Sequence, residues 1–182
     1  AYSSVEHMGI LALGMGIGGT AIFGVMLHSL NHSITKAMLF LTAGNILRAY
    51  KTKSCDEVRG ILKVLPVSGM LWTAGFFALV GFPPFGIFLS EFTILKSALD
   101  SGMTASAVIF LALLAIIFIG MSRSFLGMAQ GNAPEGMSRK TESFLCLLPP
   151  VILSIFIILG GVYIPPALNS LLHEIARALG GF

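Results

Sequence analysis

Apolar residues in this chain form long runs separated by short polar stretches, and most of these runs are long enough to cross a lipid bilayer as helices. The expected membrane-spanning segments are residues 3–16, 20–47, 67–99, 105–121 and 144–163. Backbone groups inside a bilayer must be satisfied internally, and helices achieve this within one segment. The pattern therefore predicts an all-α fold, a polytopic membrane helix bundle with about five transmembrane helices.

The third of these segments is too long for one straight crossing, and its centre contains the motif GFPPFG at residues 81–86. Pro83 and Pro84 remove two backbone donors and clash with the preceding turn, so one helix should be broken between Gly81 and Gly86. Discontinuous helices in membranes are common where ions pass, because freed backbone groups need protein or water partners. Glu91 follows this break in the second half-helix.

The C-terminal part of the chain predicts a helix of another kind. Pro165 and Pro166 end the last long apolar run, and leucine and isoleucine then recur at helical spacing. The shared apolar face would hold Leu168, Leu171, Leu172, Ile175 and Leu179. We therefore expect a transmembrane bundle over residues 1–163 and an amphipathic C-terminal helix within residues 164–182.

The composition agrees with a protein that lies mainly in lipid. Hydrophobic residues make up 55% of the 182 positions and charged residues 10%, whereas soluble domains carry about 25% charged residues. Arginine and lysine are not clustered with aromatic residues, so nucleic acid is excluded as a partner. The two cysteines, Cys55 and Cys146, match no metal or redox spacing.

The basic residues predict an orientation in the membrane. The connectors 48–63 and 122–142 hold eight of the eleven lysines and arginines, and the opposite side holds Lys96 and Arg177. By the positive-inside rule the connectors are cytoplasmic. We expect a multi-pass protein of the cell inner (cytoplasmic) membrane, with the N-terminus of this chain cytoplasmic and its C-terminus on the outer face. Loop carboxylates such as Glu142 should be solvated.

Three ionisable residues, His28, His32 and Lys36, stand at positions i, i+4 and i+8 of the second segment. On a helix they form one stripe roughly 12 Å long. Such groups are costly in a bilayer and usually face a protein interior or a water-filled path. Histidine suits proton relay because its ordinary pKa lies near neutrality. With Glu91, the stripe predicts a proton or ion path, and the alternative is a polar seam that only holds helices together.

Glu6 and His7 form another pair of ionisable residues, near the start of the chain. Glu6 and His7 are neighbours near a cytoplasmic end, so they are either exposed at the interface or the place where protons enter.

His28 and His32 have a usable metal-ligand spacing. However, no carboxylate or cysteine lies on their stripe and Lys36 would repel a cation, so the sequence predicts no metal site. No residue is predicted to be catalytic.

Three segments in this order resemble one known family. They are AYSSVEHMG at residues 1–9, HSLNHSITKAMLFLTAGNI at residues 28–46 and LVGFPPFGIFLSEFTIL at residues 79–95. Together they resemble the C-terminal half of the proton-conducting antiporter-like membrane subunits. These are the L-, M- and N-type subunits of respiratory complex I and their relatives in membrane-bound nickel–iron hydrogenases and formate hydrogenlyase.

The resemblance implies a fold of about fourteen helices, built as two inverted five-helix repeats plus flanking helices, of which this chain holds the last five, with the broken helix of the second repeat over residues 67–99. It places the stripe from His28 to Lys36 in the family's central hydrophilic axis and Glu91 at its last ionisable position, where many members have lysine. Glutamate there, with the Glu6–His7 pair, favours the hydrogenase branch and, second, the M-type subunit. The N-terminal half of the fold is absent and the chain does not begin with methionine, so we expect a fragment or a split subunit.

By the same resemblance, the expected function is proton or cation translocation within a membrane subunit of a redox-driven complex, of hydrogenase or NADH dehydrogenase type. The chain would carry no cofactor, and the redox chemistry would belong to other membrane and peripheral subunits of this oxidoreductase complex. Two alternatives stay open. One is a subunit of a multi-subunit cation/proton antiporter without a redox partner, and the other is a non-conducting membrane scaffold.

Overall fold

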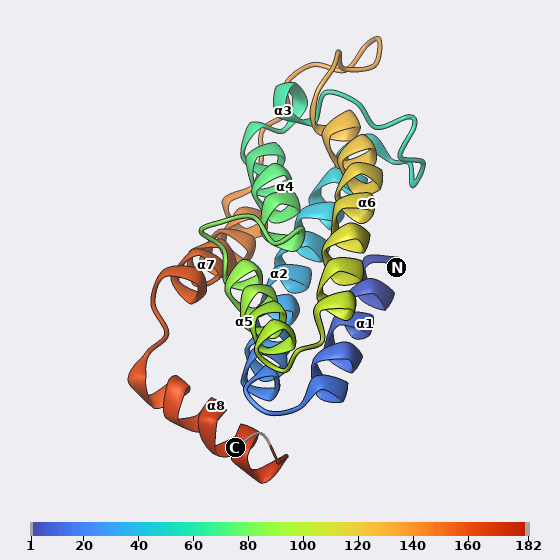
Figure 1. The fold of residues 1–182 in the computed structure, drawn as a ribbon. Coiled ribbons are helices and arrows are strands. Elements are labelled where there is room, and N and C mark those ends of the chain that lie inside the picture. Colours follow the sequence, from blue (N-terminus) through green and yellow to red (C-terminus); the bar gives the residue numbers. More distant parts are fainter. Residues whose placement is uncertain (1, 181–182) are drawn as a thin grey trace.

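The computed structural model describes residues 2–180, and the regular elements within this range are helices (Figure 1). Ala1 and residues 181–182, at the ends of the two predicted regions, lie outside the described residues. The helices are α1 (Tyr2–Ile17), α2 (Ala21–Tyr50), α3 (Ile61–Val64), α4 (Pro66–Leu79), α5 (Gly86–Asp100), α6 (Thr104–Ala129), α7 (Phe144–Val162) and α8 (Pro166–Ala178). The prediction of an all-α fold is confirmed.

Helix α2 forms the centre of the bundle and packs against α1, α4, α5, α7 and α8 (Figure 1). Its 30 residues span about 45 Å at 1.5 Å per residue. The buried positions of α2 include apolar residues such as Leu27 and Met38, but also the polar side chains of His28, His32 and Thr35. His28 and His32 of the predicted stripe therefore face the protein interior, whereas Lys36 is half-buried.

The break in the third predicted segment is confirmed, because α4 ends at Leu79 and α5 begins at Gly86. Gly81, within the break, has a φ of +66°, a conformation that only glycine adopts easily. A methyl group at this position would also overlap the carboxylate of Glu91. The glycine thus allows the broken helix to lie directly against an ionisable side chain.

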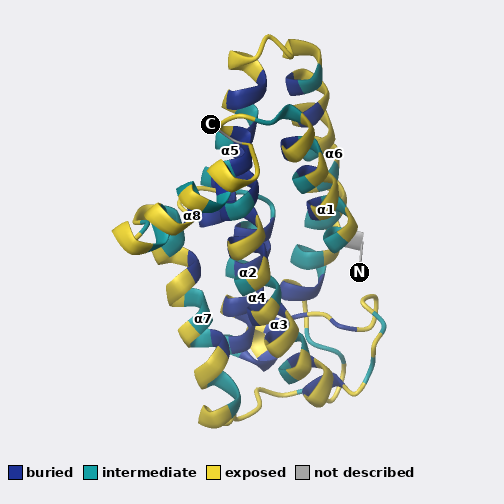
Figure 2. Cartoon of the chain, turned by 90° about the horizontal axis from the view of Figure 1, so that it is seen from below, coloured by how far each residue is buried: buried dark blue, intermediate teal, exposed yellow. Residues whose placement is uncertain are grey.

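Two helices among the described residues, α6 and α7, are long and apolar enough to cross a membrane. Helix α4 is equally apolar in character but shorter. Figure 2 shows exposed residues along α6, α7 and α8, whereas buried residues are frequent on α2. Exposed side chains of α6 and α7 include Ile119 and Val162, each 70% exposed, which suits a surface that meets lipid. The count of about five crossing helices stays a prediction.

Helix α6 is longer than its apolar run predicts. The expected end was Met121, but the helix continues to Ala129. The reason is tertiary packing: the Phe125 ring stacks on Trp72 of α4 with 4.6 Å between ring centroids, and Met128 and Ala129 are buried. The polar connector is correspondingly shorter.

The expectation that Glu142 is a solvated loop charge is wrong. Its carboxylate accepts hydrogen bonds from the backbone N–H groups of Val67 and Ser68, at 2.8 and 2.9 Å, and from the Ser68 hydroxyl. These amides belong to the first turn of α4, where N–H groups have no partner within the helix and a negative charge is favourable. Glu142 therefore caps α4 from a distant part of the sequence.

The connectors and α8 lie at opposite ends of the bundle (Figure 1). The two connectors contact each other, since the Gly60 N–H donates to the Gln130 carbonyl at 2.9 Å. At the other end, the ring of His173 on α8 stacks on Phe23 near the start of α2. Leu172 of α8 is buried against the bundle while Leu171 is 51% exposed, so the apolar face of α8 is only partly covered by protein.

Candidate functional site

Three histidines from two helices meet in the centre of the bundle. His7 of α1 lies between His28 and His32 of α2, with its ring centroid 5.1 Å from that of His28 and 4.4 Å from that of His32. His7 and His28 are fully buried, and His32 is 7% exposed. The packing of α1 on α2 therefore inserts a third imidazole between two side chains that the sequence places one turn apart.

A hydrogen-bonded chain runs through two of these rings into α5. His7 Nδ1 and His28 Nε2 are 2.9 Å apart, and His28 Nδ1 is 2.9 Å from the Ser90 hydroxyl. Ser90 donates its single proton to the Ile87 carbonyl at 2.7 Å, so its oxygen accepts from His28 Nδ1–H. His28 Nε2 then accepts from His7 Nδ1–H, which leaves His7 Nε2 with a lone pair.

That nitrogen and a second ring nitrogen have no hydrogen-bond partner in the protein. Among the described residues, His7 Nε2 and His32 Nε2 are buried and have no hydrogen-bond partner. Buried polar atoms are nearly always paired, and each exception needs an explanation such as a functional role or a water molecule. His7 Nε2 is therefore a position at which a proton can be accepted, and the adjacent His32 Nε2 one at which a proton can be accepted or released, according to its tautomer.

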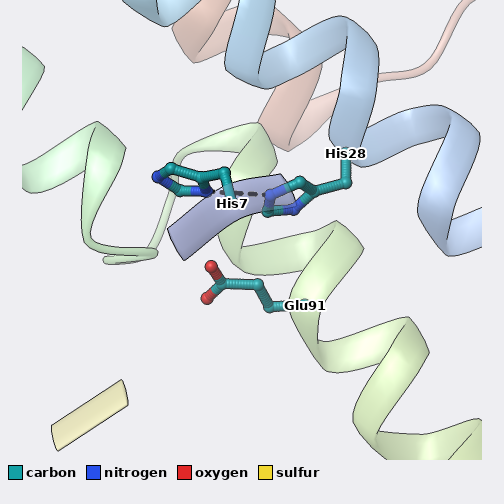
Figure 3. A group of neighbouring side chains, drawn as sticks. All are labelled: His7, His28 and Glu91. Atoms are coloured by element: carbon teal, nitrogen blue, oxygen red, sulfur yellow. Dashed lines mark hydrogen bonds between the residues drawn. The ribbon is translucent and has the colours of Figure 1, made fainter. Parts of the chain in front are cut away.

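Glu91 completes the group from the second half of the broken helix. One ligand-type atom from each of His7, His28 and Glu91 lies within 4.8 Å of the others. Figure 3 shows the facing rings of His7 and His28 with the Glu91 carboxylate on one side of the pair. Glu91 is 7% exposed, whereas Lys96 is exposed on the same helix, and the described residues contain no ion pair between them. The structure thus brings Glu91 to the histidines.

Lys36 lies at the other end of the stripe. Its ammonium group donates to the Ser3 hydroxyl of α1 at 3.0 Å and lies 5.0 Å from the centroid of the Phe40 ring. Glu6 is half-buried and close enough for its charge to interact with that of Lys36. Lys36, His32, His7 and His28 therefore follow one another through the bundle, and Glu91 lies close to both His7 and His28. Glu6 is close enough for its charge to act on both Lys36 and Glu91.

Glu6 also lines a cavity of about 440 Å³ between α1 and α6. The other lining residues are mainly apolar, among them Ile10, Leu13 and Phe110. Glu6 is the ionisable residue in this lining, so it lies between the cavity and the interior row. The structure places the predicted pair differently: Glu6 faces a cavity, whereas His7 is the centre of the histidine cluster.

The spacing of residues in the sequence does not indicate a role for Ser90. It orients His28 through a contact between residues 62 positions apart, and only its place next to Glu91 could have drawn attention to it. Asn31, beside the predicted stripe, is buried against the break, where a side chain at Gly86 would overlap its amide. Polar partners that arrive from other helices leave little signal in local spacing.

Several curated proteins are similar to this chain. Hydrogenase-4 component F homolog of Methylacidiphilum infernorum is 35% identical over 167 residues, which cover 91% of this chain and 34% of the relative. NAD(P)H-quinone oxidoreductase chain 4 2 of Thermosynechococcus vestitus is 31% identical over 168 residues, covering 84% and 32%. Formate hydrogenlyase subunit 3 of Escherichia coli is 33% identical over 109 residues, covering 53% and 18%. The chain spans about a third or less of the length of these relatives.

The fold is also similar to a solved structure. A chain in the structure of the Mrp complex from Dietzia sp. DQ12-45-1b superposes with a TM-score of 0.79 and 22% sequence identity, covering 98% of this chain and 41% of that one. Residues 1–118, which contain the histidine cluster and Glu91, match the family described as NADH:quinone oxidoreductase/Mrp antiporter, TM. The resemblance found in the three sequence motifs is confirmed, and the chain belongs to this family of membrane antiporter-like subunits.

Proposed function

We propose that this chain forms the proton-conducting part of a multi-pass membrane subunit in a redox-driven complex of the hydrogenase or NADH dehydrogenase type. The supporting observation is the buried hydrogen-bonded chain from His7 through His28 to Ser90, with Glu91 beside it. Imidazoles pass protons by taking one on one ring nitrogen and releasing one from the other, and their ordinary pKa lies near neutrality. Ionisable residues at membrane depth usually mark such paths.

In the proposed path, protons arrive at Glu6 from the cavity between α1 and α6. Lys36 and His32 exchange protons with this end of the row, and the free lone pair of His7 Nε2 accepts the next proton. His7 then passes its Nδ1 proton across the 2.9 Å hydrogen bond to His28 Nε2. Glu91 accepts or supplies protons at the end beside the broken helix. Transport in the opposite direction uses the same groups.

Partner subunits provide the energy in this proposal. The chain itself would bind no redox cofactor, and electron transfer in other membrane and peripheral subunits would change the electric field at Lys36 and Glu91. A change in a neighbouring charge alters proton occupancy, since one pKa unit corresponds to about 1.4 kcal/mol. The names of the relatives, which are subunits of hydrogenase, quinone oxidoreductase and formate hydrogenlyase, support this assignment.

We place the subunit in the cytoplasmic membrane with about five crossing segments: α1, α2, the broken pair α4 and α5, α6, and α7. The two connectors, rich in lysine and arginine, would face the cytoplasm, and α8 would lie along the outer surface with its exposed leucines in lipid. The placement of the connectors and α8 at opposite ends of the bundle supports this orientation (Figure 1).

A cation/proton antiporter without a redox partner is a second candidate, because the description of the matching family includes Mrp antiporters. It would use the same row of groups. Purification of the protein from its native membrane with gentle detergent separates the two: hydrogenase or dehydrogenase subunits in stoichiometric amounts support the redox complex, and their absence supports the antiporter.

The conduction proposal is tested with Lys36→Ala and Glu91→Gln, measured as proton uptake into vesicles that contain the assembled complex. Each variant removes one ionisable group from the row, and we expect transport to fall by at least about tenfold, equivalent to about 1.4 kcal/mol in the barrier. Lys96→Ala is the matched control, because this lysine is exposed on α5, and it should transport normally. Transport at the wild-type rate in both variants would favour the non-conducting scaffold.

A further inference from the structure

His7, His28 and Glu91 are the side chains from which one further site can be built. They come from three different helices, α1, α2 and α5, and all three are buried. One ligand-type atom of each lies within 4.8 Å of the others. We infer that these residues form a binding site for a divalent transition metal ion of the Zn²⁺ type, and that a bound ion blocks proton transfer through the histidines.

The donor set fits this class of ion. Two imidazole nitrogens and one carboxylate oxygen suit Zn²⁺ and similar ions, whereas Mg²⁺ and Ca²⁺ prefer oxygen ligands alone. Tetrahedral Zn²⁺ with bonds of about 2.1 Å needs ligand atoms about 3.4 Å apart. His7 and His28 are separated by 2.9 Å at their nearest nitrogens. A small movement of these rings apart and of Glu91 inward would therefore give three ligands and leave a fourth position for water.

The surroundings of His28 are those of a metal ligand. Its Nδ1–H donates to Ser90, which is itself fixed by its bond to Ile87. The Nε2 lone pair of His28 is therefore directed at the cluster. Metal-ligating histidines almost always donate their other ring N–H to a partner in this way, which fixes the tautomer and the ring orientation.

His7 can become a ligand without losing its ring proton. It binds through one ring nitrogen while the other holds the proton, and His7 Nε2 has no partner that would prevent this tautomer. The metal takes the place of the proton shared by His7 and His28. No net proton release or change of oxidation state is required at these two rings.

The objection raised by the sequence is met by the fold. On the stripe of α2 there is no carboxylate, but the broken helix supplies Glu91. Lys36 lies two turns from His28, roughly 12 Å along the helix, but its charge acts on His7, the other histidine of the site. Its ammonium donates to Ser3 and interacts with the Glu6 carboxylate, which offsets part of its repulsion of a cation. As a ligand, the Glu91 carboxylate also offsets part of the charge of the metal ion.

The proposed block of conduction rests on the function proposed above, whereas binding of the ion does not. Both are measured on the purified protein with its natural partner subunits retained. X-ray absorption at the zinc edge, after one equivalent of Zn²⁺ is added in the presence of excess Mg²⁺, should show two imidazole nitrogens and one carboxylate oxygen among the ligands. A ligand shell that contains only oxygen atoms would contradict the proposed site, and this result needs no variant.

Variants then locate the ion. His28→Gln and Glu91→Gln should each weaken Zn²⁺ binding more than tenfold, and Ser90→Ala about 10- to 100-fold because it removes the partner that orients His28. His173→Gln is the matched control: the chain has four histidines, and His173 on α8 lies outside the cluster. Binding that is unchanged in His28→Gln and Glu91→Gln, or lost in His173→Gln, would overturn the site.

Transport is measured in the same preparation with and without Zn²⁺. We expect Zn²⁺ to inhibit proton uptake in the wild type and to inhibit Lys96→Ala equally. Absence of proton uptake without Zn²⁺ would contradict the proposed function and leave the binding measurement valid. Normal uptake with Zn²⁺ bound at His28 and Glu91 would overturn the block.

Discussion

Single hydrogen bonds decide how the buried histidines can exchange protons. An imidazole has two nitrogens, and the neutral ring carries its proton on only one of them. At His28 this choice is made by Ser90, because the serine hydroxyl already donates to Ile87 and can only accept from the histidine. The direction of the bond between His7 and His28 follows from that one serine.

Replacement of Ser90 by alanine should therefore affect both stability and transport. The buried His28 Nδ1–H would lose its acceptor, which costs about 1–3 kcal/mol of folding free energy. His28 could then adopt the other tautomer, whose Nε2–H meets a lone pair of His7 only if His7 changes its tautomer as well. The direction of this hydrogen bond would no longer be fixed, and we expect proton uptake to fall several-fold. Thermal unfolding in detergent and proton uptake in vesicles measure the two effects.

Thr93→Val provides the control for Ser90→Ala. Thr93 lies on the same helix and its hydroxyl donates to the Leu89 carbonyl at 2.8 Å, with no contact to a histidine among its hydrogen bonds. Valine preserves its shape and removes the hydroxyl. Equal loss of transport in the two variants would show that the tautomer of His28 does not depend on Ser90.

Local spacing predicts some residues of the site and not others. His28, His32 and Lys36 could be found because they recur at helical period within one apolar segment, and Glu91 because it follows a tandem proline. The central position of His7 could not, since it depends on how α1 packs on α2. The contribution of Ser90 depends in the same way on the packing of α5. Periodicity describes one helix at a time and contains no distances between helices.

Two glycines allow helix α7 to pack closely against the broken helix. Gly160 lies against the side chain of Asn31, and Gly161 lies against the backbone of Pro84 and Phe85. A methyl group at Gly161 would overlap the Pro84 carbonyl. The absence of a side chain allows α7 to approach the break closely, and this contact covers backbone groups that the break leaves without helical partners.

Gly161→Ala should consequently destabilise the bundle. Backbone atoms of the break cannot move aside as a flexible side chain can, so α7 must shift outward, at a cost of about 1–3 kcal/mol or more. Gly120→Ala on α6 is the control, because nothing lies within 4 Å of a methyl group at that position. Unfolding temperatures of the two variants in detergent give the comparison, and equal temperatures would contradict the close fit of α7.

The sequence predicts the elements well where apolar runs define them, and less well where packing extends them. The break between α4 and α5 followed from the chemistry of proline. The last turns of α6 did not, because Phe125 continues the helix through its stacking on Trp72. The role of Glu142 cannot be predicted from the sequence for a related reason: its partners, Val67 and Ser68, are more than seventy residues away.

The whole molecule has two chemically different ends. One end holds the connectors with most of the lysines and arginines, and the other holds α8, whose apolar face is only partly covered by the bundle (Figure 1). A bilayer whose cytoplasmic side selects basic loops would orient such a molecule in one way. In that orientation the break in the helix and the buried histidines lie between the two surfaces.

Cys55 offers a direct test of this orientation, because it is exposed in the connector between α2 and α3. A maleimide that cannot cross membranes should label Cys55 in inverted vesicles, where the cytoplasmic face is outside, and not in intact right-side-out vesicles. With Cys146, which is half-buried in α7, replaced by serine throughout, Cys55→Ser should abolish that labelling. Glu174→Cys, added to Cys55→Ser on the exposed side of α8, should show the reverse pattern. Labelling of both positions from the same side would contradict the placement of the connectors and α8 on opposite faces of the membrane.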